Sequence, residues 1–212
     1  MGSSDAQSLL SARGLRCVRG DRELFTDLSL SLQAGELLQI HGANGSGKTT
    51  LLRIMCGLSL PDAGNVYWQG VSLAENRQRF LQNLSYVGHS TGIKLELSPL
   101  ENLAFAAALH GEASRMTLQQ ALDRVELFGF ENEPARTLSA GQRRRIGLAR
   151  LLISPARAWI LDEPFTALDK SGIRTLESLL HEHLESGGIV VLASHSPVNL
   201  HERYIKALHL LT

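Results

Sequence analysis

The stretch GANGSGKT, residues 42–49, holds the side chains with the clearest chemistry in this chain. It matches the pattern G-x-x-x-x-G-K-[ST] and lies between a predicted strand, ELLQIHG, and a predicted helix, TTLLRIMCGL. Glycines let main-chain N–H groups turn toward an anion, and the positive end of the following helix points at the same place. The motif therefore predicts a phosphate-binding loop. We expect contacts from Gly42, Ala43, Asn44, Gly45, Ser46, Gly47, Lys48, Thr49 and Thr50.

Two side chains of this loop have specific expected roles. Lys48 should reach the β- and γ-phosphates of a nucleotide, and Thr49 should place its hydroxyl on Mg²⁺. The chain contains only four lysines, so a lysine inside the motif is a scarcer coincidence than usual. The alternative is a flexible glycine-rich loop that merely precedes a helix.

The stretch AWILDEP, residues 158–164, supplies two acids at the end of an apolar run. A strand here delivers Asp162 at its carboxyl end, where α/β folds bind ligands. Asp162 is expected to hold Mg²⁺ through water, and Glu163 to orient or deprotonate an attacking water. Two adjacent acids at a strand end are also compatible with a solvated helix cap. The neighbouring phosphate loop favours the metal and base roles.

The stretch LSAGQRRRIGLARLL, residues 138–152, places arginines in the first turns of a predicted helix. Positive side chains there oppose the helix dipole. They are tolerated if an anion binds at the same end, with the Ser139 hydroxyl and the Gly141 N–H as donors. The alternative is an ordinary capped helix with a solvated basic face, which would be favoured if the other motifs were absent.

Composition sets the broad class of the protein. The chain has 212 residues, enough for one domain with a full core, and 21 basic residues balance 21 acidic ones. We therefore expect no nucleic-acid partner. Cys17 and Cys56 have no metal-ligand spacing and favour a reducing compartment. No apolar run approaches ~18 residues, so we expect no membrane span, and the opening MGSSDAQSLL lacks the features of a secretory signal.

The spacing of apolar residues predicts an α/β arrangement of strands and helices around these motifs. Ser98 is expected to cap a helix that has Pro99 at its first position and Glu101 completing a capping box. Strands are predicted at 9–32 (two, around a turn at Gly20), 36–42, 65–70, 84–87, 158–164, 188–195 and 204–210, the last at a sheet edge. Helices are predicted at 49–58, 98–111, 117–130, 140–153 and 169–187.

The order GANGSGKT, LSAGQ, ILDEP, TALD and ASH resembles the ATP-binding cassette (ABC) family of transport ATPases over about residues 9–210. The resemblance implies an α/β fold with a P-loop NTPase (RecA-like) core, an N-terminal antiparallel β lobe and an inserted helical subdomain of ABC type. Residues 1–212 would form a single ABC ATP-binding domain. The catalytic core would cover about 8–88 and 155–212, and the helical signature subdomain about 89–154.

The same resemblance implies ATP and Mg²⁺ as cofactors and a head-to-tail homodimer that encloses two ATP molecules. Ser139, Gly141 and Gln142 of one chain would close on the γ-phosphate held by the other. His195 in ASH resembles the histidine that contacts the γ-phosphate, and Asp169 in TALD resembles a dimer-contact aspartate. A structural histidine at a strand end is the alternative for His195.

Two positions depart from the family pattern. Most members place an aromatic residue where Arg19 stands, to stack on adenine; a guanidinium plane can also stack. Most members place a glutamine where His89 stands. That glutamine contacts Mg²⁺ and the attacking water, and it heads a loop that senses the membrane partner. Our hypothesis is that His89 replaces it as a catalytic residue. The alternative is a polar residue that simply follows a buried strand.

Several stretches narrow the resemblance within the family. GHSTGIK, WQG, ILDEPFTALD and GGIVVLASH resemble the ATPase subunit of the cytochrome c maturation (haem exporter) branch. That branch implies an integral membrane transporter subunit, haem-handling membrane proteins, a haem chaperone and a second copy of the chain as partners. It also implies the cytoplasmic face of a bacterial inner membrane.

Three other functions remain as alternatives. The first is the ATPase subunit of another ABC exporter, for lipid, peptide or drug. The second is an ABC protein that acts on DNA or ribosomes, which usually carries two cassettes or long heptad insertions. The third is a regulatory binder without hydrolysis, which would need a degraded Lys48, Asp162 or Glu163; all three are intact.

Overall fold

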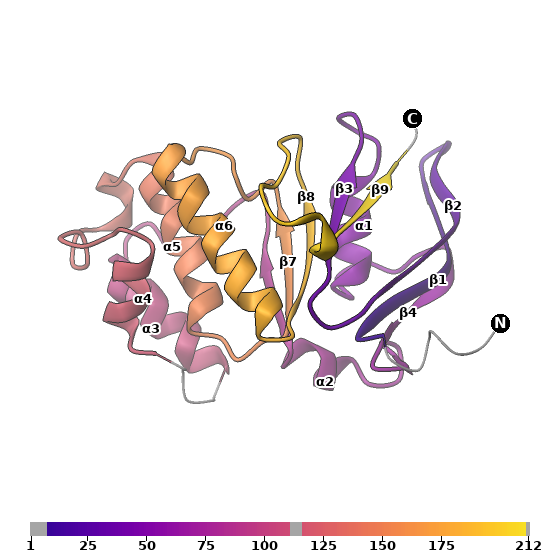
Figure 1. Ribbon diagram of the computed structural model, residues 1–212, viewed down its shortest axis with the longest axis horizontal. Coiled ribbons are helices and arrows are strands. Elements are labelled where there is room, and N and C mark those ends of the chain that lie inside the picture. Colours follow the sequence, from indigo (N-terminus) through magenta and orange to yellow (C-terminus); the bar gives the residue numbers. More distant parts are fainter. Residues whose placement is uncertain (1–7, 111–115, 211–212) are drawn as a thin grey trace.

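The computed structural model describes residues 8–110 and 116–210 and contains two β-sheets (Figure 1). The first is antiparallel, in the order β2-β1-β4-β5. Its strands are β1 (Leu10–Arg19), β2 (Arg22–Leu32), β4 (Ala63–Trp68) and β5 (Val71–Ser72). The second is parallel, in the order β6-β7-β8-β3-β9. Its strands are β3 (Leu37–His41), β6 (Leu84–Val87), β7 (Ala158–Asp162), β8 (Ile189–Ala193) and β9 (Ile205–His209).

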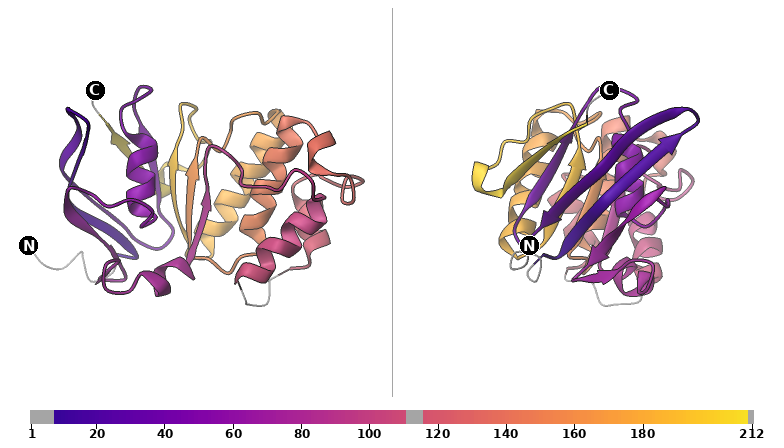
Figure 2. Two further views of the ribbon diagram at one scale, coloured as in Figure 1. Left: turned by 180° about the vertical axis from the view of Figure 1, so that it is seen from behind. Right: turned by 90° about the vertical axis from the view of Figure 1, so that its right-hand side faces the viewer.

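The helices form layers on both faces of the parallel sheet (Figure 2). Helix α1 (Lys48–Met55) packs between the two sheets, and the short α2 (Arg77–Leu81) precedes β6. The opposite face is covered by α5 (Ala140–Leu152) and α6 (Lys170–Glu185), and α3 (Pro99–His110) and α4 (Leu118–Arg124) pack on α5. Among the described residues, 3₁₀ turns lie at Ala135–Thr137 and Glu202–Tyr204. Within the described parts of the chain, no helix is both long and apolar enough to cross a membrane.

The central strands explain why the motifs converge. All residues of β7 and β8 are buried, as expected for strands covered by helices on both faces. Because the sheet is parallel, the carboxyl ends of β3, β6, β7 and β8 lie at one edge. The chain continues from these ends into Gly42, Gly88, Glu163 and Ser194, so the edge collects every motif that follows a core strand.

Several predicted elements are confirmed by the structure. Strand β9 is an edge strand, and β1 and β2 are joined through the turn at Gly20. Helix α6 stops just before Gly187, which has a φ of 82°. The cap of α3 is formed as expected: the Ser98 N–H donates to the Glu101 carboxylate at 2.8 Å, and the Glu101 N–H donates to the Ser98 hydroxyl at 3.2 Å.

The prediction of one helix over 117–130 is wrong in its length, because α4 ends at Arg124. Glu126 has a φ of 58°, and its N–H and that of Leu127 donate to the carbonyls of Asp123 and Leu122. This pattern is a Schellman termination with glutamate in the left-handed position. Leu127, the next residue, is fully buried, so the helical spacing of apolar residues continues beyond the end of the helix.

The segment between β4 and β6 contains two elements that the sequence analysis did not predict, β5 and α2. Helix α2 is only five residues long and is capped by the Asn76 side chain, which accepts from the Arg79 N–H at 3.2 Å. It buries Phe80 completely. A single turn gives no repeated apolar spacing, so periodicity cannot detect it.

Candidate active site

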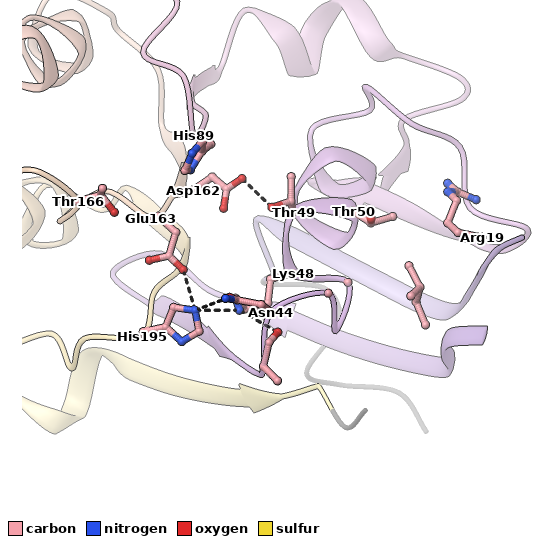
Figure 3. Close-up of a pocket in the computed structure, with 14 residues that line it drawn as sticks. Arg19, Asn44, Lys48, Thr49, Thr50, His89, Asp162, Glu163, Thr166 and His195 are labelled. Atoms are coloured by element: carbon pink, nitrogen blue, oxygen red, sulfur yellow. Dashed lines mark hydrogen bonds and ion pairs between the residues drawn. The ribbon is translucent and has the colours of Figure 1, made fainter. Parts of the chain in front are cut away.

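An open cavity of about 530 Å³ lies at the carboxyl edge of the parallel sheet (Figure 3). It brings together the 42–49 loop, the acids after β7 and the histidines after β6 and β8. Its lining residues are Arg19, Leu24, Ala43, Asn44, Gly45, Gly47, Lys48, Thr49, Thr50, His89, Asp162, Glu163, Thr166 and His195.

The backbone of the 42–49 loop requires its glycines. Gly45 and Gly47 have φ values of 79° and 100°, in the left-handed region that favours glycine. A Cβ atom on Gly42 would overlap the Ser46 hydroxyl, which is buried beneath the loop. Gly47 is the N-cap of α1 and provides no side-chain cap, so the first N–H groups of this helix are left to an anion.

Lys48 is buried, and its ammonium group folds back onto the loop. Its Nζ donates to the carbonyls of Gly42 at 2.7 Å and Ala43 at 3.2 Å, and lies 3.4 Å from His195 Nε2. These contacts fix the lysine at the wall of the cavity, beside the free N–H groups. The position suits an ammonium that neutralises phosphate charge.

Thr49 and Asp162 form the hard-oxygen pair of the cavity. The Thr49 hydroxyl donates to Asp162 Oδ2 at 2.9 Å. Asp162 is 2% exposed, and within the described residues no arginine or lysine forms an ion pair with its carboxylate. A buried carboxylate without a cationic partner, next to a hydroxyl, is a donor set that fits Mg²⁺.

Glu163 is held in an unusual backbone conformation. Its φ is 49°, which costs a non-glycine residue about 1–2 kcal/mol. Its N–H donates to the Ala193 carbonyl of β8 at 2.9 Å, and its carbonyl accepts from the Arg144 guanidinium at 2.7 Å. Glu163 Oε1 lies 3.5 Å from His195 Nε2, and Figure 3 shows both side chains directed into the cavity. A carboxylate held in this way can polarise a water at the phosphate.

His195 is placed by the turn after β8. The buried Gln39 of β3 donates through Nε2 to the Ser196 carbonyl at 2.8 Å, and the Ser196 N–H donates to the Ser194 hydroxyl at 3.0 Å. His195 Nε2 then lies 3.1 Å from Asn44 Oδ1. The histidine therefore contacts the phosphate loop and the acid of β7 from a third strand.

The LSAGQ segment lies outside this cavity. Ser139 caps α5: its hydroxyl accepts from the Gln142 N–H at 3.1 Å, and its own N–H donates to Gln142 Oε1 at 2.8 Å. The Ser139 hydroxyl can still donate its proton to a ligand. A Cβ on Gly141 would lie 2.8 Å from the Ala167 carbonyl, so glycine permits this close approach. Within one chain, these residues do not join Lys48.

Two arginines near the start of this helix make contacts within the fold. Arg144 and Arg145 are buried, whereas Arg143, in the first turn, is partly exposed. Arg145 pairs with Glu126 at 2.9 Å and Asp169 at 2.8 Å. Burial lowers the pKa of Arg144, and the charges of Asp162 and Glu163 oppose that shift.

The two positions that depart from the family pattern both line the cavity. His89 is exposed and also borders a second cavity of about 500 Å³, which extends toward the N-terminus of α5. Arg19 lies at the opposite end of the nucleotide cavity from His89 and Glu163 (Figure 3). Its Nη1 donates to the Val18 carbonyl at 2.8 Å and lies 3.5 Å from the Asp62 carboxylate. The guanidinium is therefore anchored on one side.

Sequence analysis missed Leu24, Thr166 and the contacts of Arg144. Leu24 stands outside the motifs that were singled out, and only its place in the fold brings it to the cavity, whereas Thr166 is the first residue of TALD but was given no role. Thr166 follows ILDEP by two residues, so its proximity to Glu163 was a usable signal.

Comparison with known proteins then decides the family. The profile described as ABC transporter matches residues 25–166, more than half of the chain. The chain belongs to the ABC transporter family. As a member of this family it is an ABC-type ATPase, with an α/β P-loop fold of ABC type.

Curated relatives extend the similarity over nearly the whole chain. A protein of Methylococcus capsulatus named cytochrome c biogenesis ATP-binding export protein CcmA is 50% identical over 192 residues, covering 90% of this chain and 93% of the relative. The protein of the same name from Escherichia coli strain K12 is 49% identical over 202 residues, covering 95% of this chain and 96% of the relative.

Solved structures show the same fold. A putative ABC transporter ATP-binding protein from Pyrococcus furiosus superposes with a TM-score of 0.80 at 24% identity, covering 95% of this chain and 96% of that protein. An ATP-binding cassette solved as a dimer in a post-hydrolysis state with ADP and Pi gives a TM-score of 0.79 at 23% identity, covering 95% and 94%.

Proposed function

We propose that this chain is the ATP-hydrolysing subunit of a membrane complex that handles haem for c-type cytochrome biogenesis. The observation that carries this proposal is the 49–50% identity, over 90–95% of the chain, with proteins named for cytochrome c biogenesis and export. Similarity restricted to the catalytic motifs would support an ABC ATPase of any cargo. Similarity across the helical lobe as well supports a shared task.

The proposed chemistry begins with binding of the triphosphate. The free N–H groups at the start of α1 and the Lys48 ammonium hold the β- and γ-phosphates, because both present positive charge at the cavity wall. Thr50 lines the same wall and can donate on the α-phosphate side. Mg²⁺, bound through the Thr49 hydroxyl and the Asp162 carboxylate, would supply further positive charge to the phosphates.

Hydrolysis then needs a base and a donor near the γ-phosphate. We assign the base to Glu163, whose carboxylate accepts hydrogen bonds from the attacking water and orients it in line with the leaving oxygen. His195 lies 3.5 Å from that carboxylate and 3.4 Å from Lys48 Nζ, so it can contact both the water and the γ-phosphate. His89 enters the cavity from the end of β6 and takes the place of the family's glutamine.

A second copy of the chain completes the proposed site. Ser139, Gly141 and Gln142 would donate to the γ-phosphate held by the partner, since no residue of this segment reaches the cavity of its own chain. The other proposed partners are an integral membrane transporter subunit, haem-handling membrane proteins and a haem chaperone. The complex would lie at the cytoplasmic face of a bacterial inner membrane.

The base assignment is tested with Glu163→Gln. Replacing the carboxylate by an amide of the same shape removes the group that polarises water and leaves the phosphate contacts in place. We expect kcat for ATP hydrolysis to fall about 100-fold or more, with ATP binding retained. Steady-state hydrolysis and equilibrium binding of ATP measure the two quantities. Hydrolysis at the wild-type rate in this variant would remove Glu163 from the mechanism.

The cargo is tested by purifying the complex. A tagged full-length chain, isolated from solubilised membranes, is expected to bring down a membrane subunit together with haem-handling proteins, identified by mass spectrometry. The matched experiment uses cells that carry only the Glu163→Gln chain. Those cells should fail to assemble c-type cytochromes. A lipid, peptide or drug permease in the purified complex, with normal cytochrome assembly, would support the alternative exporter instead.

A further inference from the structure

Arg144 is a buried arginine that donates four hydrogen bonds, all of them to main-chain carbonyls. It lies in the first turns of α5 and is 4% exposed. Nη1 donates to Gly88 at 3.0 Å, and Nε donates to Pro164 at 3.2 Å. Nη2 donates to Asp162 at 2.9 Å and Glu163 at 2.7 Å.

These four carbonyls belong to two separate strand ends. Gly88 follows β6 and directly precedes His89, whereas the other three span the end of β7 and the turn that carries Glu163. One side chain therefore connects α5 to both loops. Only arginine has a planar fork with five N–H donors; a lysine concentrates its donors at one atom, and a glutamine has two.

The backbone of Glu163 depends on this contact. Its φ of 49° is strained, and strained residues persist only where their surroundings hold them. The Glu163 N–H donates to Ala193 of β8, and its carbonyl accepts from Arg144 at 2.7 Å and from the Thr166 N–H at 3.2 Å. Loss of the guanidinium would leave the carbonyl with only the Thr166 contact, which comes from within the same turn and does not tie it to α5.

Helix α5 begins within the LSAGQ segment, at Ala140. Arg144 stands two residues after Gln142, the last residue of that segment. We propose that Arg144 is a positioning residue for ATP hydrolysis, which fixes the peptide units around Glu163 and His89 and ties them to the position of the N-terminal end of α5. The proposal rests on the proposed roles of Glu163 and the LSAGQ segment. Arg144 lines the adjoining second cavity and not the nucleotide cavity, so we expect it to act through the groups it holds.

The test compares Arg144→Gln and Arg144→Lys in the full-length chain, assayed in the complex with which it purifies. We expect Arg144→Gln to lower kcat about tenfold or more, because small displacements of a catalytic group are costly. The KM for ATP and the Kd for the analogue AMP-PNP should stay within about threefold of wild type. Arg144→Lys should recover part of kcat, because it keeps the charge and a subset of the donors.

The control is Arg157→Gln. Arg157 also donates to a main-chain carbonyl, that of Gly187, at 3.2 Å, but it stands at the opposite end of β7. Its loss should leave kcat at the wild-type value. Wild-type kcat in Arg144→Gln, or a fall in kcat matched by an equal fall in AMP-PNP affinity, would overturn the positioning role.

Glu163→Gln separates this proposal from the one on which it rests. If Glu163→Gln is inactive while Arg144→Gln turns over normally, only the role of Arg144 is overturned. If Glu163→Gln turns over normally, the assignment of the base fails, and the role of Arg144 fails with it.

Hydrogen exchange on the wild-type chain decides the question if neither Arg144 variant folds. On addition of AMP-PNP and Mg²⁺, amides in 88–92 and 163–167 should gain protection together with those in 140–144. Protection of the first two segments without any change in the third would contradict the coupling.

Discussion

At the scale of single residues, the nucleotide cavity is polar at one end, and its described lining residues include no Phe, Tyr or Trp that could stack on a base at the other. Lys48, Asp162 and Glu163 lie at the phosphate end, where Lys48 donates to the Gly42 carbonyl at 2.7 Å and Thr49 donates to Asp162 at 2.9 Å. The far end has Arg19. We therefore expect the phosphate groups to dominate binding, and the base to contribute less than it would against an aromatic ring.

We predict that Arg19→Tyr increases affinity for ATP. An aromatic ring adds stacking with adenine worth about 1 kcal/mol, which lowers the KM for ATP about fivefold and leaves kcat unchanged. Arg16→Tyr is the matched control, since Arg16 lies on the same strand, pairs with Glu23 at 2.9 Å and does not line the cavity. An unchanged KM in Arg19→Tyr would place the base elsewhere.

At the scale of elements, Arg145 connects three helices of the second layer. It pairs with Glu126 after α4 and with Asp169, the N-cap of α6. The pKa of Glu126 is lowered mainly by hydrogen bonds from Ser171 and Thr175, and to a smaller extent by Arg145. The pKa of Asp169 is lowered mainly by the hydrogen bond from the Gly172 N–H, and to a smaller extent by Arg145. Both carboxylates are thus more acidic in the folded chain than in the unfolded one.

This difference in pKa makes stability depend on pH. A folded-state pKa below the unfolded value adds stability that is fully present above the unfolded pKa and is lost as pH falls through the folded pKa. We predict that the melting temperature falls between about pH 5 and pH 3, and that Glu126→Gln makes the fall smaller. Glu133→Gln is the control, because within the described chain the Glu133 carboxylate has no hydrogen-bond partner. Thermal unfolding, monitored by circular dichroism, gives the melting temperature of each variant at each pH. Equal slopes of melting temperature against pH for wild type and Glu126→Gln would contradict the prediction.

The elements also show what sequence can predict here. Strands β7 and β8 are continuous apolar runs, and α1 follows a motif that requires a strand before it and a helix after it, so all three were placed correctly. The end of α4 was missed because its apolar spacing continues through a left-handed glutamate, Glu126. Glutamate gives no sign of that conformation, as glycine would.

The candidate site likewise has features that the sequence predicts and features that it does not. The sequence motifs place the phosphate loop and the acids after β7 at one strand edge, because parallel strands end together. They do not predict the strained φ of Glu163 or the carbonyl acceptors of Arg144. Those depend on main-chain atoms from β6, β7 and α5, which carry no residue-specific signal and meet only in three dimensions.

At the scale of the whole molecule, the two parts of the proposed composite site lie on separate surfaces of one chain. The parallel sheet presents the cavity at its carboxyl edge, and the helical layer presents Ser139 on the exposed end of α5. The two surfaces are separate within the chain, so the proposed composite site requires a head-to-tail pair. Each pair would then hold two composite sites.

Complementation between two inactive variants tests this arrangement. Lys48→Ala disables the phosphate side. Ser139→Asp disables the other side by charge repulsion, while aspartate still caps α5. Ser139→Asn is the matched control that keeps the cap without the charge, and it should retain hydrolysis.

Each homodimer of either inactive variant has two defective sites, whereas a mixed dimer has one intact site and one doubly defective site. If subunits exchange freely and the sites act independently, an equal mixture should regain about a quarter of the wild-type hydrolysis rate, because half of the dimers are mixed and half of their sites are intact. Titrating one variant into the other at constant total protein should give a maximum at equal amounts. A mixture that hydrolyses no faster than its components would mean that the site is built within one chain.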